Sequence, residues 1–521
     1  MSRRLVILVA LVAFGSAAVF AAGSKEGAAA PQAGSLAPVT LQVMIVADPL
    51  TDPFTGGDPN KLPYNKIMGE KLAVTLDPII TTARESEQKL QLLIAANDAP
   101  DIMSGVGTLY AGGPEKAYAD GVIVKISDHF DKTPNFKKLL DSHPEEAKYV
   151  KTDDGSVYSF GMLRDREIRV FFGPMIREDL LKKANVALPQ TVDEWYTALK
   201  ALKALGVKKP VTTVRWFPAY SSFLTGAYGV ADGLFVAPDG KMHYGPLEPS
   251  YQDYLATWSK WIREGLVDPD YFTQEDFNVV KSVLASGEAG SSVAFLSFLM
   301  QNNNGRKANP GFQLTALRHP TLKKGDPAWL GHSDPPITVT DYVNARSKNV
   351  DRALMWCDYG YSDEGHMLFN FGVKGLTFNL DNGYPRYTQA VLDALNATTP
   401  RDVSLEMYAP GSGLADCTQD ARYFEQTRLA LPEQKDALFK DKWTAFKMPT
   451  PLPPLSLTPA ELKVYTKFAE ITTYADEMRQ KFMLGNEPLA NWAAFVENLK
   501  KMGIEDVLRV ENAALARFRK R

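Results

Sequence analysis

The chain has little of the residue types from which metal and redox sites are built. Its 521 residues include 2 cysteines and 6 histidines. The histidines show no metal-ligand spacing, and no His-Glu-x-x-His zinc helix occurs. Cys357 and Cys417 are too few for a disulfide scaffold, and nothing in their spacing decides whether they pair or remain buried thiols. We therefore expect no metal ion and no cofactor.

An excess of one charge, internal repeats and nucleotide-binding loops are missing as well. The formal net charge is −3, from 58 basic and 61 acidic residues, which argues against a nucleic-acid partner. There are no repeats of the kind that a surface adhesin would have. The glycines at 105–113 have the wrong spacing for a dinucleotide-binding loop. The length and the 45% hydrophobic content instead indicate a globular protein of two or more domains.

The N-terminus carries the clearest targeting signal. Residues 1–22 combine an arginine pair, an apolar run and small residues at the expected cleavage point, which is typical of a signal peptide. The run is shorter than the ~20 residues that span a bilayer, and no cysteine stands near the cleavage point, so a lipobox is absent. Residues 23–38, rich in Ala, Gly, Ser and Pro, are expected to be a disordered tether. We expect secretion into the periplasm or outside the cell.

Strand and helix patterns alternate after the tether. A β-branched run at 39–47, helical spacing at 66–72 and 85–96 and a short apolar run at 74–76 predict a parallel sheet. The stretch 95–105 ends a helix at an Asn-Asp-Ala-Pro turn and enters a strand that stops at a glycine. Strand ends of this kind form the edge at which open α/β sheets bind ligands.

Three folded parts are expected after the tether. They are an N-terminal α/β lobe at 39–169 that later segments complete, a second α/β lobe at 170–336, and a hinge return with a helical region at 337–521 that packs on both lobes. Capping boxes at 191–194 and 458–461 predict helix starts. Residues 370–386 are predicted to be rich in loops, and 459–482 to be a helix.

Five segments match, in the same order, motifs of one protein family. These segments are Leu92–Ile102, Asp154–Gly161, Ile176–Glu194, Trp261–Pro269 and Asn370–Gly383. The fourth, WIREGLVDP, is similar to the family's YKEGLIDP, and the fifth is similar to its NYGIEG and DNG motifs. On these residues the chain resembles the family 1 extracellular solute-binding proteins of ABC importers, in particular the large oligosaccharide-type subgroup. Many relatives carry a lipobox cysteine, and this chain departs from them there.

The resemblance implies a fold and a function. The fold is α/β, a two-lobed periplasmic-binding-protein fold of the type II kind with a helical C-terminal extension. The expected function is to capture a solute, an oligosaccharide or sugar derivative, in a cleft between the lobes and to deliver it to a membrane permease. The resemblance further implies a monomer without catalytic residues.

A sugar cleft needs aromatic rings for C–H faces and a few polar groups for hydroxyls. Rings in predicted loops are the first candidates, and polar residues near predicted strand ends and turns are the second. The ring candidates are Tyr110, Trp216, Tyr220 and Phe223, followed by Trp329 and Phe371. The polar candidates are Asp48, Ser104 and Arg164.

A secreted carbohydrate-active enzyme such as a glycoside hydrolase is the alternative. It would need a pair of carboxylates flanking the scissile bond. With 61 acidic residues a pair can be imagined in many places, and the sequence singles out none. The motifs of a nucleophile elbow and of a zinc protease are both missing. The binding function is therefore favoured over the enzyme.

Overall fold

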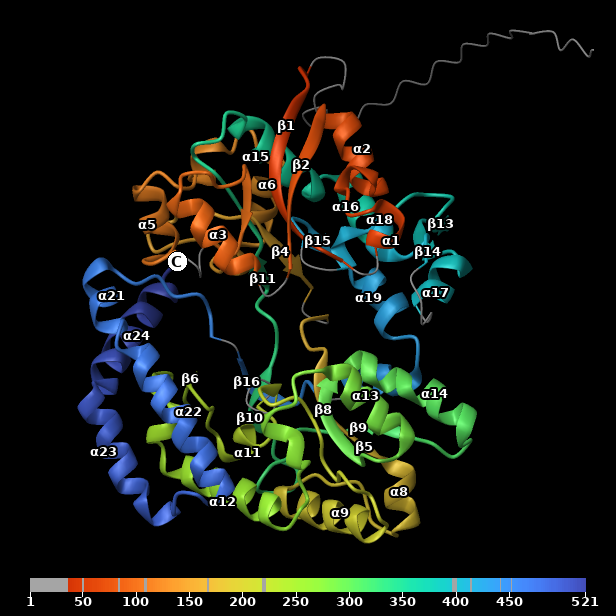
Figure 1. Cartoon of the computed structure of the whole chain (residues 1–521), viewed down its shortest axis with the longest axis vertical. Helices are drawn as coiled ribbons and strands as arrows, with labels where there is room; N and C mark the ends of the chain where they lie inside the picture. The colour runs from red at the N-terminus through yellow and green to blue at the C-terminus, as the bar shows by residue number, and fades with distance from the viewer. Residues whose placement is uncertain are drawn as a thin grey trace, which may run out of the picture.

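The computed structural model of the protein describes residues 36–48, 51–82, 85–106, 110–165, 168–217, 222–395, 401–412, 415–440, 442–450 and 452–521. Its elements form two bodies, lobe 1 and lobe 2, which several segments join (Figure 1). Within the residues given above, no helix is both long enough and apolar enough to cross a membrane.

Lobe 1 is built on a four-stranded sheet with the order β12-β3-β1-β2. Strands β1 (Val39–Val46) and β2 (Val74–Thr81) are parallel and fully paired, so β2 is longer than its apolar run predicts. Strand β3 (Ile102–Ser104) is parallel to β1, and β12 (Asp341–Val343) adds to β3 in the antiparallel direction. The predicted parallel sheet is confirmed, and the chain returns from lobe 2 to complete it.

Helices surround this sheet. They are α1 (Asp52–Thr55), α2 (Pro63–Leu72), α3 (Ser86–Ala95), α5 (Gly113–Ala119), α6 (Pro134–Ser142), α7 (Pro144–Ala147), α15 (Val350–Asp358), α16 (Asp363–Phe371), α17 (Gln389–Leu395) and α18 (Leu405–Tyr408). Helix α3 ends as its sequence predicts, because Asn97 adopts a left-handed φ of 57° before the proline turn into β3.

Two smaller sheets complete lobe 1. Strand β4 (Gly161–Arg164) lies between β11 (Ile337–Val339) and β15 (Thr418–Gln419). Strands β13 (Phe378–Asp381) and β14 (Tyr384–Tyr387) form a hairpin where a loop-rich segment is predicted. Its turn, Asn382-Gly383, has φ of 49° and 82°, the left-handed pair that Asn-Gly supplies in a tight hairpin.

Lobe 2 has a central strand, β5 (Phe172–Arg177), between β8 (Ser291–Phe295) and β9 (Leu314–Ala316). Its other strands form two pairs: β10 (Ala328–His332) with β16 (Phe446–Thr450), and β6 (Leu234–Val236) with β7 (Met242–Tyr244).

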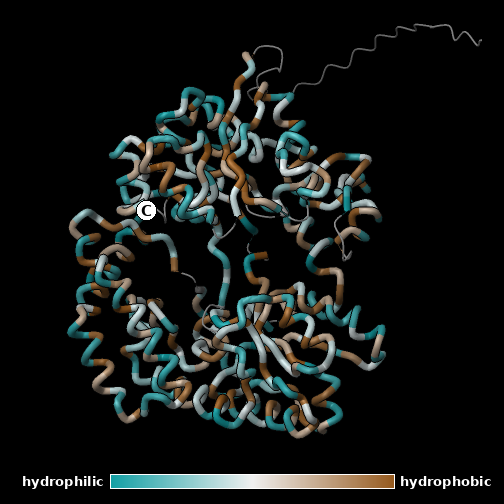
Figure 2. Tube along the Cα trace, in the orientation of Figure 1, coloured by the Kyte–Doolittle hydropathy of each residue, from teal (hydrophilic) through white to brown (hydrophobic). Residues whose placement is uncertain are grey.

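The helices of lobe 2 are α8 (Glu178–Lys183), α9 (Val192–Ala204), α11 (Thr225–Tyr228), α12 (Pro249–Arg263), α13 (Phe277–Ser286), α14 (Gln301–Ala308), α20 (Pro432–Phe439), α21 (Pro459–Tyr465), α22 (Phe468–Leu484), α23 (Trp492–Met502) and α24 (Ile504–Phe518). Both predicted capping boxes form, at the starts of α9 and α21. The single helix predicted for 459–482 is divided into α21 and α22 at Thr466 and Lys467, although both residues keep right-handed helical dihedrals. Figure 2 shows polar and apolar residues alternating along the outer helices, as expected for helices that bury one face.

Three segments cross between the lobes. The first follows β4 and leads into β5, and the second leads from β10 to β11. The third follows β15 through α19 (Ala421–Arg428) into α20 (Figure 1). Since β4, β11 and β15 are neighbours in one sheet, the lobe 1 ends of all three crossings lie together.

The C-terminal helix makes a further contact between the lobes. Helix α24 packs on the β6–β7 hairpin of lobe 2, and its end lies against the turn of lobe 1 that contains Asp153. Asp153 accepts hydrogen bonds from Arg517 Nε at 2.7 Å and from Arg521 Nη2 at 2.7 Å. The ring of Phe518 meets Tyr149 edge-on at 5.4 Å. One carboxylate therefore binds two arginines of the other lobe.

We expect Asp153→Asn to lower the free energy of unfolding by about 1–3 kcal/mol, because the guanidinium groups lose a charged acceptor and the Arg521 side chain is almost fully buried. Urea unfolding followed by circular dichroism measures this. The control is Asp506→Asn. Asp506 lies on α24, the helix that carries Arg517, and its carboxylate binds Arg509 on the surface. Equal stability losses in the two variants would contradict the role of Asp153.

Candidate functional site

A cavity of about 380 Å³ lies where the three crossings meet. Residues of both lobes and of α19 line it: Arg164, Ile168, Phe171, Phe295, Leu296, Ser297, Gln419, Tyr423, Phe424 and Arg428. Arg164 ends β4 of lobe 1, and Phe295 ends β8 of lobe 2. Because its walls come from both bodies, this cavity changes shape when the lobes rotate about the crossings.

One wall of the cavity is aromatic. The rings of Phe171 and Phe295 stack at 6.1 Å between centroids, with 12° between their planes. Phe295 also contacts Phe217 at 5.2 Å and Phe277 at 4.9 Å, so a cluster of rings in lobe 2 supports the wall from behind. The neighbouring rings hold Phe295 in a fixed orientation, and such a face suits the apolar side of a ligand.

The opposite wall is polar and carries Arg164. Its Nη1 lies 2.9 Å from Asp334 Oδ2 and donates to Thr338 Oγ1 at 2.9 Å. Its Nε donates to Gln419 Oε1 at 3.2 Å. Asp334 lies in the second crossing, Thr338 lies on β11 directly after it, and Gln419 precedes the third crossing. The guanidinium group of Arg164 therefore joins all three crossings while it faces the cavity.

Trp216 lies outside the residues that line the cavity but next to its aromatic wall. It is 44% exposed, and its ring meets Phe217 and Phe277 edge-on at 5.4 and 5.7 Å. Both of these rings contact Phe295. Trp216 thus continues the aromatic cluster from the cavity wall to the surface. Tyr220, four residues further on, lies outside the described residues.

Three further candidates lie within lobe 1, away from the cavity. Asp48 lines a pocket of about 170 Å³ whose walls are all lobe 1 residues. Burial, together with the charge of Asp48, raises the pKa of Tyr64 to about 12. Tyr110 donates a hydrogen bond to Asp120 at 2.6 Å, beside a pocket that is also formed by lobe 1 alone. Ser104 Oγ donates to Asp341 Oδ1 at 2.5 Å. The structure brings none of these three to the wall of the interlobe cavity.

The structure corrects two ring candidates. Phe223 is fully buried in lobe 2 and packs edge-on against Trp195 at 5.1 Å. Phe371 is fully buried between Phe378 and Tyr387. Both are core residues that a ligand does not reach. Trp329, on β10, is half-buried and donates from Nε1 to the carbonyl of Val236 at 3.2 Å, outside the cavity lining.

Sequence reasoning missed most of the lining. Phe295 is the last residue of β8, which is antiparallel to β5, so the rule for the carboxyl ends of parallel strands does not single it out. Phe171 stands beside the predicted lobe boundary. Tyr423 and Arg428 lie on α19, and nothing in their local sequence pattern distinguishes them from other residues of a helix.

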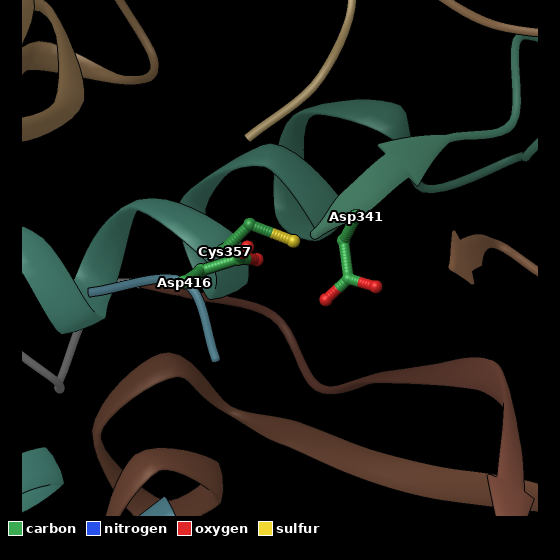
Figure 3. Close-up of side chains that lie close together, drawn as sticks. All are labelled: Asp341, Cys357 and Asp416. Atoms are coloured by element: carbon green, nitrogen blue, oxygen red, sulfur yellow. The ribbon is translucent and has the colours of Figure 1, made fainter. Parts of the chain in front are cut away.

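A second cluster lies inside lobe 1, next to the crossings. Oxygens of Asp341 and Asp416 and the sulfur of Cys357 all lie within 4.8 Å of one another (Figure 3). Both cysteines of the chain are buried free thiols, which settles the open question of their pairing. Thr340 Oγ1 donates to Asp416, and Ser104 donates to Asp341.

Burial favours the neutral, protonated forms of the groups in this cluster. Burial and the charge of Asp341 raise the pKa of Asp416 well above its ordinary value, and burial raises the pKa of Asp341. Burial and the two carboxylates also raise the pKa of the Cys357 thiol, which disfavours the thiolate that a metal ion would need. Two carboxyl groups that share a proton account for the arrangement without a cation.

The comparisons with known proteins define the class of the protein. The chain belongs to the bacterial extracellular solute-binding proteins, whose family model matches residues 64–367. The two-lobed α/β fold expected from the sequence is thereby confirmed.

Individual relatives align with this chain over nearly its whole length. The fructooligosaccharide ABC transporter substrate-binding protein FusA of Streptococcus pneumoniae is 25% identical over 540 residues, which cover 95% of each chain. The solved structure of the alginate-binding protein AlgQ2 without calcium ion has a TM-score of 0.76 at 24% identity, covering 93% of this chain and 99% of that one. FusA of S. pneumoniae in complex with kestose has a TM-score of 0.72 at 20% identity, covering 92% and 100%.

The acidic cluster predicts a dependence of stability on pH. The folded state binds a proton at Asp416 more tightly than the unfolded state, whose pKa is near 3.8. The free energy of unfolding therefore falls as the pH rises above 3.8 and the buried carboxyl must ionise. Between pH 4 and pH 7 the free energy of unfolding should fall less in Asp416→Asn than in the wild type. We expect the two decreases to differ by about 1 kcal/mol or more.

Urea unfolding at pH 4, 5, 6 and 7 tests this prediction. The control is Asp98→Asn, because Asp98 is exposed in the turn after α3. The control should follow the wild-type curve. A curve for Asp416→Asn that runs parallel to the wild type over this range would show that Asp416 does not carry the effect.

Proposed function

We propose that this protein is the substrate-binding component of an ABC importer, which captures an oligosaccharide in the interlobe cavity and delivers it to a membrane permease. The observation that carries the proposal is the cavity at the crossings, with stacked phenylalanines on one wall and an anchored arginine on the other. Rings for C–H faces and a few fixed polar groups are the lining that sugar recognition needs.

Membership of the family and the names of its relatives support this function. The relatives include a fructooligosaccharide-binding protein of an ABC transporter and a polygalacturonan/rhamnogalacturonan-binding protein of Bacillus subtilis, which is 24% identical over about half of each chain. A protein of this family works outside the cytoplasmic membrane. We propose that residues 1–22 are a cleaved signal peptide, and that the mature chain acts as a monomer in the periplasm or outside the cell.

The division into parts belongs to the same proposal. Lobe 1 at 39–169, lobe 2 at 170–336 and the returning region at 337–521 fit a molecule that closes by rotation about its crossings. The third part supplies α19 to the cavity and α24 to the contact with Asp153. Closure would then change the cavity and the C-terminal contact together.

The lining favours binding over hydrolysis. A glycoside hydrolase needs two carboxyl groups facing the bond that it cleaves. Among the described residues that line the cavity there is no aspartate or glutamate. The close carboxyl pair Asp341 and Asp416 belongs to the interior of lobe 1, where Thr340 and Ser104 occupy its oxygens.

A thermal-shift screen with mono- and oligosaccharides tests the function. A ligand that binds only the folded state raises the melting temperature, since it lowers the free energy of that state. We expect at least one oligosaccharide to do so and to be recovered unchanged by chromatography. A cleaved or otherwise modified sugar in the mixture would contradict the transport function and favour the enzyme.

Trp216→Ala tests the outer ring of the aromatic cluster. We expect the Kd to rise about fivefold, which corresponds to about 1 kcal/mol of lost ring contact, while the melting temperature without ligand changes little because Trp216 is largely exposed. Titration calorimetry measures the Kd. The matched control is Phe439→Ala, another exposed ring of lobe 2 that lies outside the cavity lining. An unchanged Kd in Trp216→Ala would remove Trp216 from the site.

A further inference from the structure

Building on the proposed function, we infer that the ligand is an acidic oligosaccharide, whose carboxylate binds the guanidinium groups of Arg164 and Arg428. The charge of the cavity lining carries this inference. The described lining residues include two arginines and no acidic residue. The other described lining residues are aromatic, aliphatic or neutral and polar, so they add no negative charge to the two arginines.

Arg428 has no ionic partner among the described residues to balance its charge. It is the last residue of α19, it is half-buried, and it forms no hydrogen bond or ion pair with any residue that the structure describes. Arg422, on the same helix, instead binds Asp420 through Nε at 2.9 Å. Partial removal of a guanidinium group from water is unfavourable when no partner replaces the lost hydration. A bound anion offsets this desolvation free energy through charge-assisted hydrogen bonds.

Arg164 has a different role in the same cavity. Asp334 balances its charge, and its Nε and Nη1 are occupied by Gln419, Thr338 and Asp334. Its Nη2 makes no hydrogen bond with a described residue, and a guanidinium group can donate five N–H bonds. Arg164 is therefore a rigid donor that fixes the orientation of an oxygen acceptor, while Arg428 supplies the net positive charge.

The other walls indicate a sugar acid and not a small inorganic anion. The stacked rings of Phe171 and Phe295 offer an apolar face that phosphate or sulfate alone would leave uncovered. The volume of about 380 Å³ lies near the lower end of the range for small-molecule sites, which suits a short oligosaccharide. A uronic acid combines a C–H face for the rings with a carboxylate for the arginines.

Arg428 has one other structural role to separate from binding. A cation in the last turn of a helix interacts favourably with the helix dipole, with or without ligand. Arg428→Gln would lose that contribution in the unliganded protein. The melting temperature without ligand measures it, and the ratio of affinities for acidic and neutral sugars measures the proposed recognition independently.

The experiment uses uronic-acid trisaccharides, namely trigalacturonate, triglucuronate, trimannuronate and triguluronate. Each is compared by titration calorimetry with the same trisaccharide after reduction of its carboxyl groups to hydroxymethyl groups. We expect one uronate to bind at least tenfold more tightly than its reduced form. We expect Arg428→Gln to remove most of that difference and Arg428→Lys to keep part of it.

Arg263→Gln is the matched control, because Arg263 is an exposed arginine of lobe 2 at the end of α12 and outside the cavity lining. If the reduced or another neutral oligosaccharide binds as tightly as every uronate, the inference is overturned and the proposed function stands. If no acidic or neutral oligosaccharide binds, both are overturned. If a uronate is preferred but Arg428→Gln keeps the full preference, the assignment to Arg428 is wrong.

Discussion

The guanidinium group of Arg164 is the interaction on which the arrangement of this molecule depends. It leaves the end of β4, where the first crossing begins, and bonds to Asp334 and Thr338 around the second crossing and to Gln419 before the third. A short aliphatic side chain in its place would leave Asp334 without its cationic partner and the three segments without a common bond. A movement of any one crossing must therefore strain or reorient a group that also faces the cavity. This couples the position of the lobes to the geometry of the site.

A second polar cluster, formed by Asp341, Cys357 and Asp416, lies inside lobe 1 close to the same crossings. Asp341 follows the second crossing on β12, and Asp416 precedes β15 and the third. These two carboxyl groups can lie beside a thiol in the interior because a shared proton, in place of a bound cation, reduces the repulsion between them. The raised pKa values of both carboxyls favour this protonated form. The polar groups around the crossings thus fall into two kinds: a charged set that faces the cavity and a protonated set that holds the sheet strands behind it.

The elements of the fold were largely predictable because their signals are local. A proline turn ends α3, capping boxes start α9 and α21, and a β-branched run forms β1. The β13–β14 hairpin shows that a local signal can be present and still be overlooked, since Asn382-Gly383 is a strong hairpin turn. The site was far less predictable. Choosing rings because they lie in loops failed at Phe223, whose loop is folded beneath Trp195. Burial is set by what packs on a segment from elsewhere in the chain.

Because burial depends on distant parts of the chain, the sequence of such a protein does not reveal the charge of its ligand. The family, in contrast, can be recognised from the sequence. Family motifs lie in the helices and turns that build the two lobes, and this fold is shared by proteins named for fructooligosaccharide and for alginate. Selectivity for charge depends instead on which ionic groups of the lining remain unbalanced after folding. Here Asp334 lies 2.9 Å from Arg164 and balances its charge, while Arg428 has no ionic partner among the residues that the structure describes. Two arginines that look alike in the sequence therefore have different roles, and only the positions of their partners in the fold distinguish them.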